Sequence, residues 1–166
     1  PLDVGLQSAF TVEMWITQNA VNGAGTLFSE DELGFDTTGA FNITVLSNGA
    51  LQFEVNNLDN LTTATGLVTT GVPMHVAVTH DSTAGAGNDN TFIYIDGVEV
   101  ASGEVTSPSI ASDLLVGRRG LGDGFEGESA ELRIHDSALA PGVIQDGFDN
   151  QTLPDDAGLI AYYTFN

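Results

Sequence analysis

Cysteine and lysine are both absent from the 166 residues, and only three arginines face 23 acidic residues. Without cysteine the chain can form no disulfide and can do no thiol chemistry. The formal net charge of −20 repels phosphate groups, so nucleic acids and anionic membranes are poor partners. Two compatible interpretations of this acidity remain open. One is adaptation to high-salt water, whose counterions screen self-repulsion, and the other is a calcium-dependent protein outside the cell.

Long apolar runs are absent too, because none approaches the roughly 18–20 residues of a membrane span. No signal peptide is visible, and a chain that begins Pro1-Leu2-Asp3 without an initiator methionine is expected to be a processed or excised piece. Length and a hydrophobic content of 42% predict one domain, residues 1–166, with its own core.

Signals for nucleophilic catalysis are missing as well. The sequence has no Gly-x-Ser-x-Gly motif, and its three histidines lie in or beside apolar, strand-like segments. His75 and His80 are five residues apart and fall on opposite faces of one strand, which argues against a shared zinc site. The histidines are therefore interpreted as structural residues.

The clearest structural signal lies between residues 74 and 102. Segments 75–79 and 91–95 are near-alternating and rich in β-branched and aromatic residues, which predicts two strands. Asp96-Gly97 then separates segment 91–95 from 98–100, and this dipeptide is a strong signal for a type I′ hairpin turn. Three neighbouring antiparallel strands are expected here.

Similar patterns predict strands along most of the chain. Residues 10–17 alternate so that Phe10, Val12, Met14 and Ile16 share one face, while Trp15 lies on the other. Trp15 is interpreted as a core or loop-anchoring residue, with a sugar-stacking platform as the alternative. Further strands are expected at 27–29, 40–46, 50–55, 61–68, 114–117, 128–136 and 158–165, and one short helix near 140–148.

Four of these segments carry a family resemblance, which covers about residues 1–150. The strand at 10–16 resembles "FTxExWV", residues 74–102 resemble "hVAvTyD" followed by "xYxDGxxVAS", 115–118 resemble "LxIGR", and 125–139 resemble "FxGxIDEVRIYDxAL". In this order they are similar to the laminin G-like, concanavalin A-like jelly roll of secreted prokaryotic surface proteins. The resemblance implies an all-β, two-sheet antiparallel sandwich that acts as an extracellular recognition or adhesion module, with carbohydrate binding as the first expectation.

Calcium is a candidate cofactor, but this sequence differs from the family at a position that contributes to calcium binding in relatives. The Asp of "IDEVR" helps to hold a structural calcium in relatives, and Ala130 stands at that position here. A calcium ion would therefore need oxygen ligands from loops. The candidates are Asp31, Asp81, Asp89 and Asp123.

One stretch of glutamates resembles the catalytic strand of an enzyme. Glycanases that share the jelly roll use an E-x-D-x-x-E strand, and Glu126, Glu128 and Glu131 have the spacing E-x-E-x-x-E. Retaining hydrolysis needs two carboxyl groups about 5–5.5 Å apart. Because the central Asp is replaced and the stretch resembles a non-catalytic family segment, the prediction is that the chain is not an enzyme.

Two kinds of partner follow from these features. A glycan could stack on aromatic rings, for which the candidates are Trp15, Phe35, Tyr94, Tyr162 and Tyr163. A neighbouring surface protein is the alternative, because segment 158–166 resembles the strand "GLVAYWxFDE" that opens the domain in relatives. We expect residues 158–165 to pair beside residues 2–4, either within the chain or in the next subunit of a homo-oligomer or filament.

Overall fold

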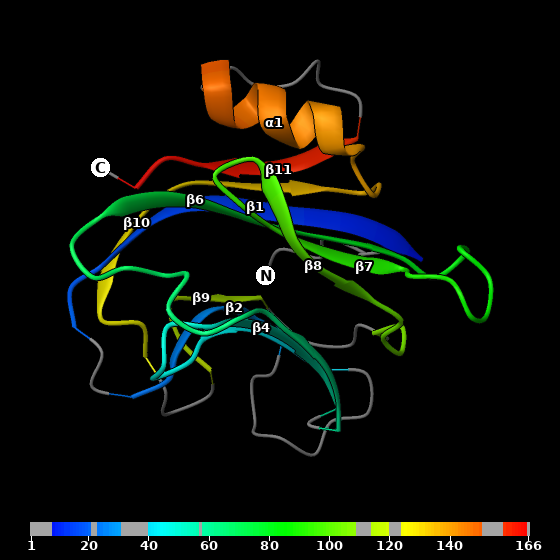
Figure 1. Ribbon diagram of the computed structural model, residues 1–166. Helices are drawn as coiled ribbons and strands as arrows, with labels where there is room; N and C mark the ends of the chain where they lie inside the picture. Colours follow the sequence, from blue (N-terminus) through cyan, green and yellow to red (C-terminus); the bar gives the residue numbers. More distant parts are fainter. Residues whose placement is uncertain are drawn as a thin grey trace.

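The computed structural model describes residues 8–20, 23–30, 40–56, 58–108, 114–119, 124–150 and 158–165. Two antiparallel sheets stack face to face, and one helix covers the outside of one of them (Figure 1). This arrangement confirms the predicted all-β sandwich with a single short helix. In the described part of the chain no helix is long and apolar enough to cross a membrane.

The larger sheet has six strands in the order β11-β10-β1-β6-β7-β8. Its strands are β1 (Ala9–Gln18), β6 (Pro73–Asp81), β7 (Thr91–Ile95), β8 (Val98–Gly103), β10 (Gly127–His135) and β11 (Leu159–Tyr163). The second sheet follows the order β5-β4-β3-β2-β9. It consists of β2 (Gly25–Ser29), β3 (Phe41–Val45), β4 (Leu51–Val55), β5 (Asp59–Thr62) and β9 (Leu115–Val116).

The core lies between the sheets, and strand alternation fills it. Phe10, Val12, Met14 and Ile16 of β1 all point inward and are at most 2% exposed. The Phe10 ring stacks on that of Phe41 in the opposite sheet, with the centroids 5.3 Å apart. Burying each such side chain contributes about 1.5–3 kcal/mol. The face of β1 predicted to be apolar is therefore the face that joins the two layers.

The hairpin between β7 and β8 also forms as predicted. Asp96 and Gly97 have φ values of 50° and 77°, as a type I′ turn requires. The Asp96 carboxylate additionally accepts a hydrogen bond from the backbone N–H of His75, at 2.9 Å. A Cβ atom on Gly97 would lie 2.8 Å from the Gln145 side chain, so the hairpin tip packs closely against the helix.

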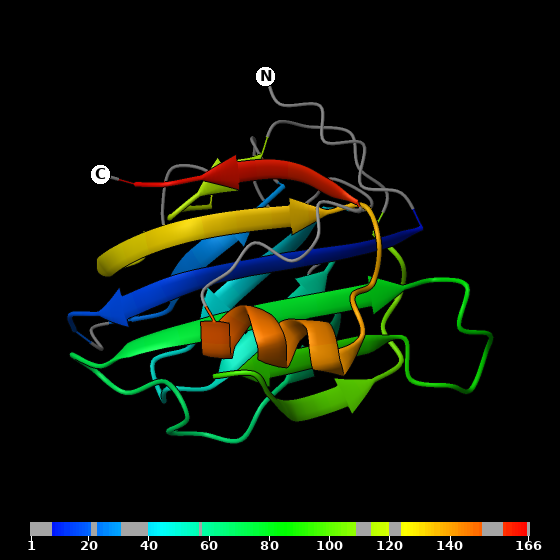
Figure 2. The same ribbon diagram turned by 90° about the horizontal axis from the view of Figure 1, so that it is seen from above.

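That helix, α1 (Pro141–Asn150), lies across the outer face of the six-stranded sheet (Figure 2). Pro141 occupies its first turn, where a missing N–H costs nothing. Ile144 is fully buried and packs on Ala77 and Tyr94 of the sheet. Upstream, Thr11 of β1 donates a hydrogen bond to the carbonyl of Ser137 and accepts one from the N–H of Leu139. These bonds fix the segment that delivers α1 onto the sheet.

Two strand predictions need comment. The strand expected at 61–68 is wrong in extent, because β5 ends at Thr62. Gly66 adopts a φ of 77°, which turns the chain, and Thr63 accepts a hydrogen bond from the Leu51 N–H through its side chain. The C-terminal strand β11 folds back within the same chain and pairs with β10. Residues 2–4, beside which we expected it, lie outside the described residues.

Candidate functional site

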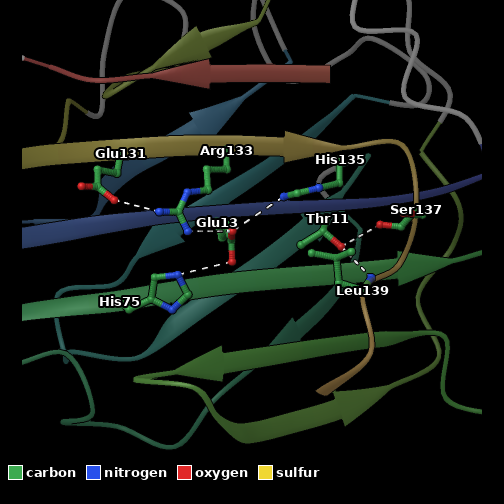
Figure 3. Close-up of polar contacts among 8 residues, drawn as sticks. All are labelled: Thr11, Glu13, His75, Glu131, Arg133, His135, Ser137 and Leu139. Atoms are coloured by element: carbon green, nitrogen blue, oxygen red, sulfur yellow. Dashed lines mark hydrogen bonds and ion pairs between the residues drawn. The ribbon is translucent and has the colours of Figure 1, made fainter. Parts of the chain in front are cut away.

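The outer face of the six-stranded sheet holds a buried group of charged side chains beneath α1. Glu13 projects from β1 to this face and is only 1% exposed. Its Oε1 lies 3.4 Å from Arg133 Nη1 and 3.7 Å from His135 Nε2, both on β10. Its Oε2 lies 3.4 Å from Nε2 of His75 on β6. Figure 3 shows the two imidazoles on opposite sides of the carboxylate.

These neighbours determine the ionisation of Glu13. Burial alone would raise its pKa, because the charged form loses water. The contacts with His135 and His75 and the charge of Arg133 outweigh this penalty and lower the pKa from 4.5 to about 2. Glu13 is therefore ionised across the physiological range, and the helix closes over an ion-paired group.

The segment that carries Glu126, Glu128 and Glu131 does not assemble a pair of free carboxylates. A bulge interrupts the β1–β10 register, with Glu131 at a φ of 52°. The Glu131 carboxylate makes an ion pair with Nη2 of Arg133, at 2.9 Å. Glu128 and Glu126 line separate hollows of the described surface. The glycanase arrangement thus finds no support in this geometry.

Of the four loop acids proposed for calcium, the structure describes two. Asp31 and Asp123 lie outside the described residues. Asp81 uses Oδ1 to accept hydrogen bonds from the N–H and the hydroxyl of Thr83, at 2.8 and 2.7 Å, and these bonds lower its pKa. Asp89 is exposed. Within the described residues no three His, Asp or Glu side chains come together to hold a metal ion.

An open groove of about 410 Å³ lies at one end of the same outer face. We call it the Trp15 groove, and it is lined by Trp15, Ile16, Thr17, Pro73, Glu128, Ser129, Ala130 and Phe165. Sheet register brings its floor together, because Thr17 of β1 pairs with Glu128 on one side and with Pro73 on the other.

Aromatic rings shape this groove. Trp15 stacks on Phe148 of α1, with the centroids 5.7 Å apart and the planes at 25°, so the helix fixes its orientation. Phe165, which follows β11, is 44% exposed and stacks on Tyr163. The hydroxyl group of Thr17 and the carboxylate of Glu128, which are paired on the outer face, provide polar atoms nearby. Flat apolar rings beside oxygen atoms suit a ligand that has both an apolar face and many hydroxyl groups.

The sequence identified only part of this site. Trp15 packs on Phe148 of α1, as an anchoring residue would, and it also lines the groove, where its sugar-stacking role stays a prediction. Tyr94 is buried, Phe35 lies outside the described residues, and Tyr162 and Tyr163 are exposed on β11 without lining the groove. Phe165 was missed, because its place depends on the pairing of β11 with β10. Its signal was the alternation of the C-terminal strand.

Comparison with known proteins agrees with this architecture. Residues 2–145 match the family described as the concanavalin A-like lectin/glucanases superfamily, and the chain therefore belongs to that superfamily. No curated protein matches the sequence.

Several solved structures share the fold. One is a candidate carbohydrate-binding protein from Bacteroides ovatus, with a TM-score of 0.72 and 20% identity. That match covers 95% of this chain but only 45% of the Bacteroides chain, so the chain spans about half of that protein. A second is a CBM40 module of a Ruminococcus gnavus sialidase bound to α2,3-sialyllactose, with a TM-score of 0.63, 15% identity and coverage of 80% and 77%.

A third is domain 4 of the extracellular arabinanase AbnA from Geobacillus stearothermophilus, solved in complex with arabinotriose. Its TM-score is 0.62, with 24% identity and coverage of 86% of this chain and 68% of that domain. At identities this low, the structural similarity shows a shared fold and no more than that.

Proposed function

We propose that this chain is a non-catalytic carbohydrate-binding module of an extracellular or cell-surface protein, and that the Trp15 groove is its binding site. The observation that carries the proposal is the groove itself, in which Trp15 and Phe165 flank polar side chains on one open face. The superfamily and the glycan-binding neighbours support the same class of ligand. The ion pair of Glu131 with Arg133 favours binding over bond cleavage, because it engages one of the three carboxylates whose spacing suggested a glycanase.

Binding in such a groove would combine two contributions. The apolar face of a sugar ring packs on the rings of Trp15 and Phe165, and the rigid stack of Trp15 on Phe148 avoids an entropic cost on binding. Sugar hydroxyls exchange hydrogen bonds with Thr17 and Glu128. Because the groove is open to solvent, we expect dissociation constants in the micromolar to millimolar range, which correspond to binding free energies of about −4 to −8 kcal/mol.

The only tryptophan of the chain lies in this groove, so intrinsic fluorescence reports on the proposed site. Titration with a panel of oligosaccharides should shift or quench the Trp15 emission. Phe165→Ala should weaken the response at least about tenfold, whereas Leu58→Ala, at an exposed apolar residue on the other sheet, should not. A panel with no binder would refute carbohydrate binding. Release of new reducing ends would refute a non-catalytic role.

Calcium dependence stays a separate proposal, which rests on the acids Asp31, Asp81, Asp89 and Asp123. If they bind the ion in the folded state, calcium raises the melting temperature by mass action. Sodium chloride at matched ionic strength is the control, because it screens the repulsion in this acidic chain. Equal stabilisation by sodium would leave only the adaptation to salt.

A structural role in a surface assembly is the second candidate. In the described part of the chain β11 is the last strand of its sheet, and Ile160, Tyr162 and Tyr163 are exposed on it. Such an edge is a template for another strand. Light scattering as a function of concentration tests it, together with a variant truncated after residue 157. Concentration-dependent oligomers that vanish on truncation favour assembly, and a monomer throughout refutes it.

A further inference from the structure

The residues that line the Trp15 groove include no arginine, lysine or histidine, although the buried His75 ring packs against Trp15, with the centroids 5.5 Å apart. The chain has three arginines and no lysine. Arg133 is 1% exposed and lies in the ion-paired group with Glu13 and Glu131. Arg119 is 8% exposed, and Arg118 follows β9 in the other sheet, where its carbonyl accepts a hydrogen bond from Ser29. All three histidines are at most 1% exposed. None of these side chains lines the groove.

The groove instead presents a negative charge. Glu128 lies on the exposed start of β10, directly opposite Thr17, and its carboxylate can only accept hydrogen bonds when ionised. The backbone N–H groups of β1 are used within the sheet, because β1 is paired on both sides, with β6 and with β10. The net charge of −20 adds a negative potential over the whole surface.

On the basis of the proposed function, we infer that the Trp15 groove selects uncharged glycans and rejects glycans that end in sialic or uronic acid. A carboxylate ligand is held most strongly by an arginine or a lysine, and the residues that line the groove include neither. Sugar hydroxyls, in contrast, donate well to a carboxylate such as Glu128. The charged residues around Trp15 and Phe165 thus determine whether the groove accepts a neutral or an anionic glycan.

The test is a fluorescence titration of the full chain with matched glycan pairs. Each neutral oligosaccharide, lactose among them, is compared with its sialylated or uronic counterpart in 0.1 M salt, with Trp15 emission as the readout. The neutral member should bind at least about tenfold more tightly. Equal or tighter binding of the anionic member would overturn the inference and leave carbohydrate binding intact. A panel without any binder would overturn the proposed function itself.

Two further measurements isolate the cause. Glu128→Gln should reduce the ratio of the affinities for neutral and anionic glycans at least about threefold. Glu99→Gln, the same change of charge at an exposed site on β8, should leave this ratio unchanged. Raising the salt to 1 M shortens the screening length from about 10 to about 3 Å and should also reduce the ratio. Discrimination that responds neither to Glu128→Gln nor to salt would overturn the inference.

Discussion

Replacement of Glu13 by glutamine probes the buried group under α1. The substitution keeps the size and shape of the side chain and removes its charge. It leaves Arg133 with Glu131 as its remaining ion-pair partner, and it leaves the imidazoles of His75 and His135 facing a neutral amide. All of these changes take place at a position that is 1% exposed, where water cannot substitute.

The expected loss of stability follows from the pKa of Glu13. A pKa lowered from 4.5 to about 2 means that the folded protein stabilises the carboxylate by about 3 kcal/mol, at about 1.4 kcal/mol for each tenfold change in proton affinity. Breaking buried ion pairs by removing one partner costs about 3–5 kcal/mol in general. We therefore expect Glu13→Gln to lower the free energy of unfolding by about 3 kcal/mol at pH 7.

Urea unfolding at a series of pH values measures this loss. Because the folded pKa is lowered, the stabilising effect of Glu13 is present above pH 4.5 and disappears as the pH falls towards 2. The difference between the wild type and Glu13→Gln should shrink over the same window. Glu99→Gln, on the exposed part of β8, should change stability by no more than about 0.5 kcal/mol. A small loss at pH 7, or a large one that persists unchanged at low pH, would refute the reasoning.

Two other predictions concern the sheet that carries the groove. Burial lowers the pKa of His80 to about 4 despite the charge of Asp81, so the free energy of unfolding should fall between about pH 6.5 and pH 4, where the unfolded state gains a proton. His80→Gln should flatten this dependence of stability on pH in urea titrations. An unchanged slope would contradict the assignment. Gly97→Val should lower stability in thermal unfolding by about 1–3 kcal/mol, because the φ of 77° disfavours a β-branched residue and a Cβ atom would meet Gln145. Gly97→Asn should lower stability less, because asparagine tolerates this φ better. Equal losses of stability in the two variants would contradict the explanation.

Alternation of residues made most of the fold predictable. The inward positions of β1 from Phe10 to Ile16 are all apolar, so the sequence defines both faces of this part of the strand. Asp96-Gly97 gave the hairpin because only a few residue pairs accept two positive φ values. The helix was expected near 140–148 and ends at Asn150, a difference within the usual uncertainty of helix ends.

The bulge in β10 shows where alternation stops being informative. Strict alternation from Glu128 and Ala130 would place Leu132 on the outer face, yet Leu132 is fully buried in the core and Arg133 points outward. The extra residue at Glu131 shifts the phase, and a glutamate at a φ of 52° has no local sequence signal. The ion pairs of Arg133 could therefore not be foreseen.

The candidate site was predictable only in its central residue. The sequence placed Trp15 on the outer face of its strand, but the groove also needs Phe148 of α1 to orient the ring and Phe165 to flank it. These residues are far apart along the chain and meet through the docking of α1 and the pairing of β11. Tertiary contacts of this kind cannot be predicted from a local sequence pattern.

A crystal structure of the chain with a neutral oligosaccharide selected from the fluorescence panel would test the central claim most directly. The account predicts a sugar ring against Trp15 and Phe165, with hydroxyls within hydrogen-bond distance of Thr17 or Glu128. A sugar bound elsewhere, for example in the hollow lined by Gln18 and Glu126, with the Trp15 groove left empty, would contradict it.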